Sequence, residues 1–387
     1  MYDVIIIGAG PSGLNSARRL AKKGLDILVL EKKEKIGSHV VCTGIVSVDA
    51  FTEFGLSPSS ILLPIDKIKW VSPRGNELLY EHPRPFAYVV DREKFDKNLY
   101  EEAKLLGVDV ILHSEVVDIV YRDGYLEVEV MREKKYKQKF RAQIVIIASG
   151  IDYRLNKKLG LGIPRNFLYA VQAELNLEEF VFPHVFVGRE IAKGAFAWAV
   201  PIKNSMVRIG LMTEENSKEC FKRLLKKYFP FEVNNLDKAN IQYKTIAQGI
   251  VSPTYGRRVL SVGEAAAQVK TTTGGGIYFG LLCSEIASQV VNRLFEIGNF
   301  EKSELSEYER LWKKAIQKEI IVGYYTRKIC GKFSDNQIDK MFKIAQSDGV
   351  IPLIKERGDF DWHSGLLLTL MKRIPVFQMI KTCFERE

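Results

Sequence analysis

The sequence lacks the features that would place it in a membrane or cross-link it through cysteine. No run of eighteen apolar residues is present, so we expect no membrane-spanning segment. The chain enters an apolar strand pattern by Val4 without a basic leader, so we expect no signal peptide. The five cysteines are scattered and form no C-x-x-C pair, which argues against a disulfide framework and against a metal site. A cytoplasmic setting with reduced thiols is the simplest expectation.

The sequence also lacks a recognisable nucleic-acid-binding module, although its formal net charge is +10. Runs of lysine of this kind are usually solvated helix faces or hairpin edges. The alternative role is contact with anions: cofactor phosphates, a diphosphate substrate or an anionic membrane surface, the last at most peripherally. The apolar content of 46% and the charged content of 27% are those of a globular protein. A chain of 387 residues can form two or three domains.

The best-defined motif lies at the N-terminus, where a strand, a glycine-rich turn, a helix and a second strand follow one another. Residues 4–7 and 27–30 are apolar runs typical of buried parallel strands. Between them, Gly8 permits a tight turn, Gly10 lets the backbone approach a pyrophosphate, and Gly13 lets the helix pack on the strand. The free N–H groups at the helix N-terminus attract phosphates.

An acidic residue follows the second strand. Glu31 lies eighteen residues after Gly13, where a carboxylate would accept hydrogen bonds from ribose hydroxyls. A glycine-rich turn without any ligand is the competing interpretation. The strand before the glycines, the helix after them and the acid together favour a dinucleotide site.

The rest of the chain divides into an α/β part, a β-rich part and a helical part. An amphipathic helix is expected at residues 93–106, and a β-hairpin at 66–80. Further strands are expected in the first part at residues 109–112, 115–121, 126–131, 137–141 and 143–148, and in the second at 168–177, 181–187, 195–200, 206–212, 243–246 and 259–262. Further helices are expected at residues 217–228, 274–297, 304–323, 335–345 and 366–384, the last broken at Pro375.

Four stretches together carry a family resemblance. They are residues 8–31, the segment Val90-Asp-Arg92-Glu-Lys-Phe-Asp96, the segment Phe196-Ala-Trp198-Ala-Val-Pro201, and residues 260–266 with the glycines 274–276. This set resembles the geranylgeranyl reductase family of flavoproteins, which shares its fold with p-hydroxybenzoate hydroxylase and the flavin-dependent halogenases. The resemblance extends from residue 1 to about 330 and implies that the dinucleotide is FAD.

The resemblance implies the fold class and domain organisation. We expect an α/β protein, α+β overall, with a discontinuous Rossmann-like FAD-binding domain, an antiparallel β-sheet substrate domain and a C-terminal helical region. The expected FAD-binding domain comprises residues 1–65, 86–160 and 250–298. The substrate domain comprises residues 66–85 and 161–249, and the helical region residues 299–387.

The resemblance also implies roles for individual residues. Arg92 lies near the FAD, Gly263 and Glu264 hold its ribityl and pyrophosphate portion, and the glycines 274–276 pass under the isoalloxazine ring. Glu264 replaces the family's usual Asp and has a longer side chain. The expected FAD-contacting residues are Gly8, Gly10, Pro11, Ser12, Gly13, Glu31, Lys32, Cys42, Arg92, Val117, Ser149, Gly150, Gly263, Glu264, Gly274, Gly275, Gly276 and Ile277. The expected substrate-contacting residues are Phe196, Trp198, Pro201 and Tyr278.

Simpler interpretations exist for several of these residues. Trp198 fits a core position on an alternating strand, and Arg92 fits a surface position at the start of a helix. Cys42, the one candidate acid, is also compatible with an inert small residue in a loop. Glu264 is compatible with capping the next segment.

The implied activity is the saturation of C=C bonds in geranylgeranyl or related isoprenoid chains of a lipid or prenyl precursor. Such a bond is not polarised, so protonation followed by hydride transfer from flavin N5 is the expected route. The sequence shows one dinucleotide motif and no separate NAD(P)H domain. The external reductant is therefore transiently bound NAD(P)H or a protein such as ferredoxin.

Two other reaction classes remain open from the sequence. A flavin monooxygenase would usually have Asp-Gly where Ser149-Gly150 stands, and a halogenase would have Trp where Phe196 stands. A dehydrogenase that passes electrons to a quinone or an electron-transfer protein is the second of these classes, and a non-enzymatic FAD-binding scaffold also remains open.

Overall fold

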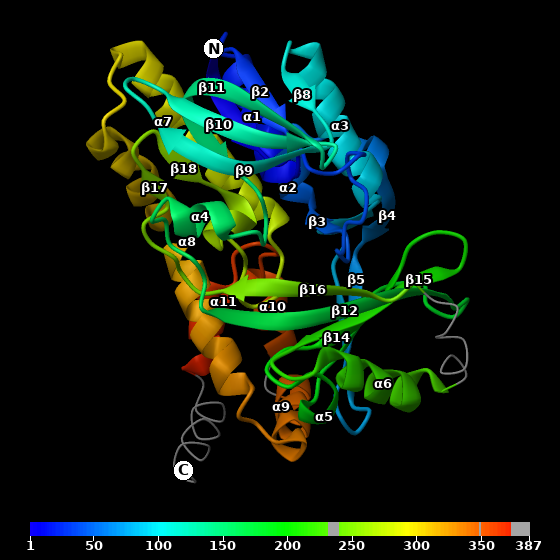
Figure 1. The fold of residues 1–387 in the computed structure, drawn as a ribbon. Helices are drawn as coiled ribbons and strands as arrows, with labels where there is room; N and C mark the ends of the chain where they lie inside the picture. Colours follow the sequence, from blue (N-terminus) through cyan, green and yellow to red (C-terminus); the bar gives the residue numbers. More distant parts are fainter. Residues whose placement is uncertain (231–239, 348–349, 373–387) are drawn as a thin grey trace.

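The computed structural model describes residues 1–230, 240–347 and 350–372, and it contains three β-sheets with helices packed around them (Figure 1). The largest sheet has eight strands. Its central strand β1 (Tyr2–Ile7) pairs in parallel with β2 (Ile27–Leu30) and with β11 (Tyr136–Ile147). Beyond these lie β8 (Asp109–Ile111), parallel to β2, and β18 (Val259–Ser261), parallel to β11. The central parts of this sheet, such as residues 4–7 and 27–30, are apolar because helices and other strands cover both faces.

Strand β11 corrects the sequence prediction of two separate strands at 137–141 and 143–148. It is continuous from Tyr136 to Ile147. Its first half pairs antiparallel with β10 (Leu126–Arg132), which pairs with β9 (Ser114–Tyr121), whereas its second half pairs in parallel with β1. The change from mixed to apolar sequence therefore marks a change of neighbours and not a break in the strand. The short strand β17 (Tyr255–Gly256) completes this sheet beside β18.

The second sheet has seven strands in the order β16-β12-β15-β14-β13-β5-β6. The predicted hairpin is confirmed as β5 (Lys67–Val71) and β6 (Glu77–Glu81). The other strands are β12 (Asn166–Asn176), β13 (His184–Phe186), β14 (Ala197–Pro201), β15 (Met206–Thr213) and β16 (Gln242–Gln248). A third sheet, which the sequence did not predict, consists of β3 (Ile45–Ser47), β7 (Ala87–Val90) and β4 (Ile61–Ile65).

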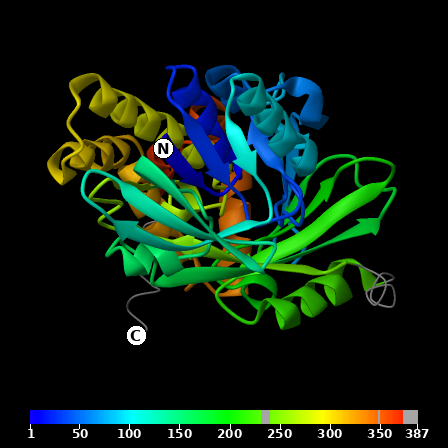
Figure 2. The same cartoon turned by 45° about the horizontal axis from the view of Figure 1, so that its top comes forward.

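Helices α1 (Pro11–Ala21), α3 (Arg92–Leu105) and α7 (Ile277–Ile297) cover one face of the eight-stranded sheet (Figure 2). Helix α6 (Ser217–Tyr228) packs on the seven-stranded sheet through Phe221 and Leu224. The shorter elements are α2 (Val48–Phe54), η1 (Pro58–Ser60), α4 (Arg154–Lys158), α5 (Arg189–Ala192) and η3 (Gly263–Ala266).

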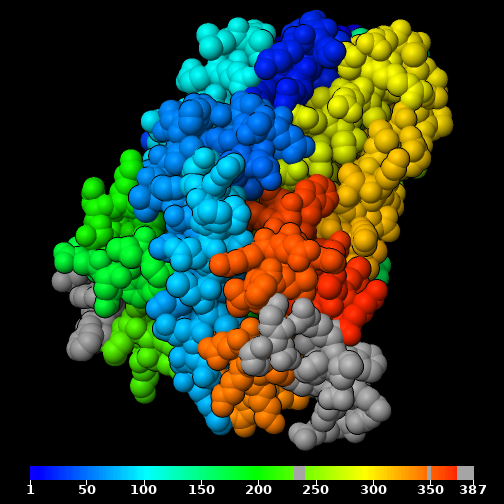
Figure 3. Space-filling model, turned by 180° about the vertical axis from the view of Figure 1, so that it is seen from behind, coloured from blue at the N-terminus to red at the C-terminus, as the bar shows by residue number. Residues whose placement is uncertain are grey.

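The C-terminal part is helical, as predicted. Helix α8 (Lys302–Cys330) is longer than the predicted 304–323 and is followed by α9 (Asp335–Ser347), α10 (Val350–Arg357) and α11 (Ser364–Met371). Helix α9 lies against the β5–β6 hairpin, where the Asp339 carboxylate accepts a hydrogen bond from the Arg74 N–H (Figure 3). The predicted helix 366–384 begins in α11, and Pro375 lies outside the described residues. Among the described residues, no helix is long and apolar enough to cross a membrane.

Candidate functional site

The turn between β1 and α1 is built from glycines with different surroundings. Gly8 has φ +104°, and a Cβ there would lie 2.5 Å from the carbonyl oxygen of Ala148. A Cβ on Gly13 would lie 2.0 Å from the carbonyl oxygen of Gly8, so helix and turn touch through their backbones. A Cβ on Gly10 would meet no atom within 4 Å. Packing of the protein itself therefore explains Gly8 and Gly13 but not Gly10.

The start of α1 leaves its N–H groups available for an anion. Gly10 is the N-cap residue and has no side chain to accept from them, and Pro11 follows it. Glu31, at the end of β2, accepts a hydrogen bond from the Ala9 N–H at 2.7 Å and from the Lys33 N–H at 2.9 Å. The structure thus brings the uncapped helix and the buried carboxylate together at one edge of the sheet.

Four other expected FAD-contacting residues lie farther along this region. Val117 is on β9 and 37% exposed, and the side chain of Lys32 is 54% exposed. Ser149 and Gly150 follow β11, where the Ser149 hydroxyl donates to the Asp152 carbonyl. Of these residues, Ser149 approaches the turn, because a Cβ on Gly8 would lie 3.4 Å from the Ser149 Cα atom.

The segment after β18 meets the same turn. Gly263 has φ +66°, and a Cβ there would lie 2.4 Å from the Ser12 hydroxyl oxygen. Gly280 on α7 also approaches Ser12, with the same calculated distance of 2.4 Å for its Cβ. Two segments that are distant from Ser12 in sequence, at Gly263 and Gly280, therefore converge on it. The Gln268 side chain, which the sequence reasoning missed, accepts from the Gly263 N–H at 2.7 Å and holds this turn in place.

Glu264 makes an ion pair that the sequence did not reveal. Its Oε2 atom lies 3.0 Å from the Nζ atom of Lys244 on β16, and both side chains are partly exposed. The Glu264 carbonyl oxygen also accepts from the Tyr153 hydroxyl at 3.3 Å. The ion pair of Glu264 with Lys244 thus connects the turn after β18 to the second sheet.

The glycines 274–276 form the last turn before α7, which begins at Ile277. Gly274 has φ +71°, and its Cβ would lie 3.0 Å from Ile246 and 3.1 Å from Met212, which belong to strands of the second sheet. Gly276 is the N-cap residue of α7 and again provides no capping side chain. This run therefore lies where the second sheet meets a second uncapped helix N-terminus.

The loop around Cys42 is held from two sides. The Gly44 N–H donates to the Cys42 sulfur at 3.3 Å, and the Gly44 carbonyl accepts from the Val90 N–H at 2.7 Å. From the second sheet, Arg208 donates to the Thr43 carbonyl at 3.0 Å. The Gln172 side chain donates to the Cys42 carbonyl at 3.4 Å. The sequence reasoning missed Gln172 and Arg208.

Cys42 and Arg92 act on each other electrostatically. Burial acts to lower the pKa of Arg92, but its ion pair with Asp96 at 2.9 Å and the nearby Cys42 sulfur together outweigh burial and raise that pKa, so Arg92 stays charged. Burial acts to raise the pKa of the Cys42 thiol. The charges of Arg92 and Lys244 and the Gly44 N–H outweigh it and hold that pKa below its usual value.

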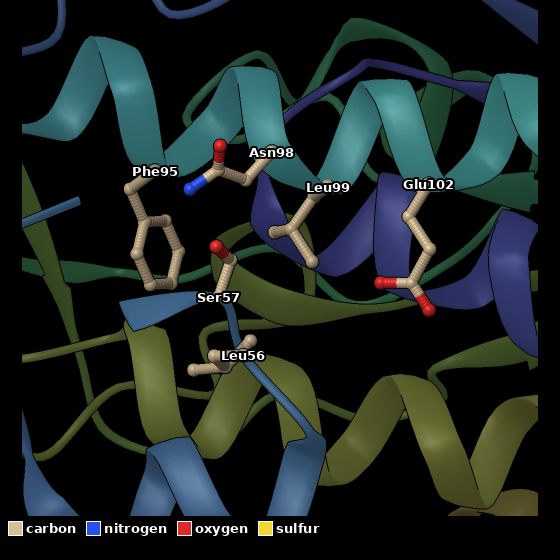
Figure 4. A pocket seen from close by; sticks show the side chains of 6 residues that line it. All are labelled: Leu56, Ser57, Phe95, Asn98, Leu99 and Glu102. Carbon is tan, nitrogen blue, oxygen red and sulfur yellow. The ribbon is translucent and has the colours of Figure 1, made fainter. Parts of the chain in front are cut away.

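Cys42 and Arg92 lie on the wall of a cavity of about 370 Å³. Its other walls come from the loop 37–40, the start of α3, and the strands β12, β15 and β16, and include His39, Gln172, Arg208 and Gln242. Most of these side chains are polar. A second hollow of about 20 Å³, between α3 and residues 56–57, has room for little more than a water molecule and contains no predicted site residue (Figure 4).

The predicted substrate residues fall into two places. Phe196 and Trp198 lie side by side, with ring centroids 6.1 Å apart, in an apolar cluster between the seven-stranded and three-stranded sheets. Pro201 ends the same strand. Tyr278 lies apart from them in the helical core, where its hydroxyl donates to Glu53 at 2.6 Å. The indole N–H of Trp198 is buried and has no partner among the described residues.

The residues of the converging segments fit a bound FAD. Gly10 has free space beside it, the N-termini of α1 and α7 are uncapped, and the Nε atom of Arg92 is buried without a partner among the described residues. The anionic pyrophosphate of FAD would satisfy the N–H groups of α1, and other polar atoms of the cofactor would satisfy α7 and Arg92.

The comparisons with known proteins agree with this geometry. A family model described as "FAD binding domain" matches residues 1–281. The chain belongs to the FAD binding domain family. The family match confirms the expected FAD-dependent oxidoreductase, and the similar structures described below confirm its fold class.

Individual relatives are distant but match along most of their length. The digeranylgeranylglycerophospholipid reductase of Methanocaldococcus jannaschii is 28% identical over 364 residues, covering 88% of this chain and 90% of that protein. A geranylgeranyl bacteriochlorophyll reductase-like protein of Thermoplasma acidophilum has a similar structure, with a TM-score of 0.84, 22% identity and 99% coverage of both chains. A p-nitrophenol 4-monooxygenase of Pseudomonas putida has the same fold, with a TM-score of 0.74, 18% identity and 98% coverage of both chains. The individual site residues and the domain boundaries stay predictions.

Proposed function

We propose that this protein is an FAD-dependent reductase that saturates C=C bonds in the geranylgeranyl or related isoprenoid chains of a lipid or prenyl precursor. The substrate class is supported by the names of the relatives, among them the reductase of Methanocaldococcus jannaschii. The observation that carries the proposal is the position of Cys42. Its thiol has a lowered pKa and lies beside Arg92 on the wall of a cavity.

The FAD is held by the segments that converge on Ser12. The N–H groups of α1 bind the pyrophosphate, Glu31 accepts from a ribose hydroxyl, and the turn at Gly263 approaches the ribityl chain. The glycines 274–276 and the N-terminus of α7 face the flavin ring and favour negative charge on it. When bound and reduced, FAD supplies a hydride from N5.

The protein's own groups supply the proton and the apolar surroundings. Cys42 donates the proton to the CH carbon of the double bond, and the resulting thiolate is stabilised by Arg92 and the Gly44 N–H before it regains a proton from water. A lowered pKa makes this thiol a stronger acid than an ordinary cysteine. Phe196 and Trp198 lie in the apolar cluster where an isoprenoid chain would exclude water and where aromatic faces stabilise cationic character.

Each turnover adds two electrons and two hydrogens to the double bond, so a further reductant must return two electrons to FAD. NAD(P)H in transient contact, or an electron-transfer protein such as ferredoxin, fills this role. The substrate is a lipid or its precursor, so contact with a membrane surface would be peripheral.

Anaerobic reoxidation tests the proposal. The FAD-loaded protein is reduced with dithionite, a geranylgeranyl lipid is added, and the flavin absorbance and the product mass are followed. We expect reoxidation with a gain of two hydrogens for each bond reduced. A Cys42→Ser variant that still binds FAD should reoxidise about 10²–10⁴-fold more slowly, the usual contribution of a general acid. Cys330→Ser, which alters an exposed cysteine on α8, is the matched control.

A second reaction class has support from the shared fold of the p-nitrophenol 4-monooxygenase. If only oxygen reoxidises the flavin and the product gains an oxygen atom, the protein is a monooxygenase and the reductase proposal is wrong. If electrons pass to a quinone with no change in lipid mass, the protein is a dehydrogenase.

A further inference from the structure

A buried lysine lies next to the glycine run that precedes α7. Lys270 is only 6% exposed, and its ammonium contacts the Asp361 carboxylate at 2.7 Å and the Phe360 carbonyl at 3.1 Å. The Phe360 ring lies 4.7 Å from the same ammonium. Lys270 is not one of the predicted site residues, and the proposed function gives it no role.

Backbone hydrogen bonds join Lys270 and the glycine run in one turn. The Lys270 N–H donates to the Gly275 carbonyl at 2.9 Å, and the Gly274 N–H donates to the Lys270 carbonyl at 2.8 Å. A Cβ on Gly275 would lie 3.0 Å from the Cε atom of Lys270 and 3.7 Å from its Nζ atom. The charged end of Lys270 therefore lies beside the run, together with the Thr273 hydroxyl, whose oxygen would lie 3.4 Å from the same Cβ.

The C-terminal segment 360–364 covers the outer side of this turn. The Thr272 hydroxyl and the His363 ring nitrogen Nδ1 are 2.6 Å apart, and the Glu319 carboxylate on α8 accepts from the His363 and Ser364 N–H groups. Burial and the charge of Lys270 lower the pKa of His363, so this ring adds no positive charge at neutral pH. Asp361 is thus the carboxylate that directly pairs with Lys270.

A buried ion pair is an unusual choice if its only task is to hold a loop. Taking both charges out of water costs free energy that their attraction often does not recover, and an apolar pair of similar volume serves packing at least as well. Hydrogen bonds at Thr271 and Thr272 already fix the turn. A charge at this place does have an effect that apolar side chains lack: it alters the electrostatic potential at the adjacent backbone.

We propose that Lys270 and Asp361 are positioning residues that set the electrostatic potential at the flavin through the glycines 274–276. Lys270 favours the reduced, more negative flavin, and Asp361 limits this effect. The inference rests on the proposed placement of the flavin at this run. Lys270 is bonded to Gly275 through its backbone, whereas Asp361 is bonded to the Lys270 ammonium, so we expect the positive charge to dominate at the run.

The test measures the midpoint potential of bound FAD by equilibration with reference dyes, together with FAD affinity and thermal stability. Lys270→Met should lower the affinity for reduced relative to oxidised FAD by about tenfold, which corresponds to a decrease of about 30 mV for a two-electron couple. Asp361→Asn should shift the potential in the opposite direction. A purely structural role would weaken FAD binding in both variants without opposite shifts, and that result overturns the inference.

Two further variants cover the case in which an unpaired buried charge prevents folding. The double variant Lys270→Met/Asp361→Leu removes both charges together and should have a lower potential than the wild type, because Lys270 dominates. Lys270→Arg keeps the charge and should keep the potential. Equal potentials in the wild type and the double variant refute the inference. If the wild-type protein binds no FAD, the proposed function is refuted. If the protein reduces lipid but the variants have the same midpoint potential as the wild type, only the role of Lys270 and Asp361 is refuted.

Discussion

Replacing Gly10 with alanine should affect FAD binding without affecting folding. Gly10 has φ −81° and ψ 178°, which any residue adopts without strain. A Cβ there meets no protein atom within 4 Å. We therefore expect Gly10→Ala to fold normally and to bind FAD poorly, because the methyl group would hold the pyrophosphate away from the N–H groups of α1.

The substitution has different effects on the stability of the FAD-free protein and of the FAD-bound protein. Without FAD, alanine reduces the freedom of the unfolded chain, which stabilises by about 0.4–1 kcal/mol, but it is a poorer N-cap than glycine by a similar amount. The free energy of unfolding should then change by less than about 1 kcal/mol. FAD at about 100 times its Kd stabilises a protein by about 2.7 kcal/mol. If Gly10→Ala weakens FAD binding tenfold, the same FAD concentration stabilises the variant by only about 1.4 kcal/mol.

Urea unfolding with and without FAD measures both quantities. Gly13→Ala is the matched control, since its Cβ would lie 2.0 Å from the Gly8 carbonyl oxygen and neither backbone can yield easily. That variant should lose several kcal/mol even without FAD, within the range of overpacked sites. The reasoning is refuted if Gly10→Ala binds FAD as tightly as the wild type, or if it destabilises the FAD-free protein as much as Gly13→Ala does.

Three further predictions concern residues around and beyond the Cys42 loop. The pH dependence of Cys42 alkylation by iodoacetamide, followed by peptide mass, should give a pKa below the ordinary value of about 8.5, and Arg92→Gln should raise it. Arg208→Met leaves the Thr43 carbonyl without its donor, so urea unfolding should show a loss of about 1–3 kcal/mol. Burial lowers the pKa of His184 to about 4, so the folded protein binds fewer protons than the unfolded chain between that value and about 6.5. Stability should therefore decrease as pH falls through this range, by at most about 3 kcal/mol, and His184→Gln should abolish that part of the decrease.

Three of the parallel strands were predictable because short and almost entirely apolar runs mark them. These runs are residues 4–7, 27–30 and 259–262, and all three strands lie in the eight-stranded sheet. The third sheet was missed because its strands are three to five residues long and follow no clear alternation. Helix α2 has seven residues, too few for a helical period to stand out. Short elements of this kind are stabilised by their neighbours and not by their own sequence.

The candidate site divides in the same way. The turn at Gly8, Gly10 and Gly13 was predictable because its function depends on local backbone geometry within a dozen residues. Arg208 was not, since a single charged residue on an alternating strand is typical of a solvent-facing position. Its role depends on the register of β15 with β12, which sets Arg208 opposite Glu174, and on the approach of that sheet to the loop at Thr43. The sequence does contain a signal for Lys270. A lysine between an apolar segment and a run of threonines and glycines is a candidate for a buried charge.

The acidity of Cys42 depends on contacts between parts of the fold as well as on its own loop. Besides the Gly44 N–H of that loop, the groups that lower its pKa come from α3 through Arg92 and from β16 through Lys244. The hydrogen bonds that hold its backbone come from β12 through Gln172 and from β15 through Arg208. A shift of the second sheet relative to α3 would therefore change both the position of the thiol and its acidity at once. Because Lys244 also pairs with Glu264 beside the predicted ribityl contact, occupancy of the FAD site and the acidity of Cys42 should be linked.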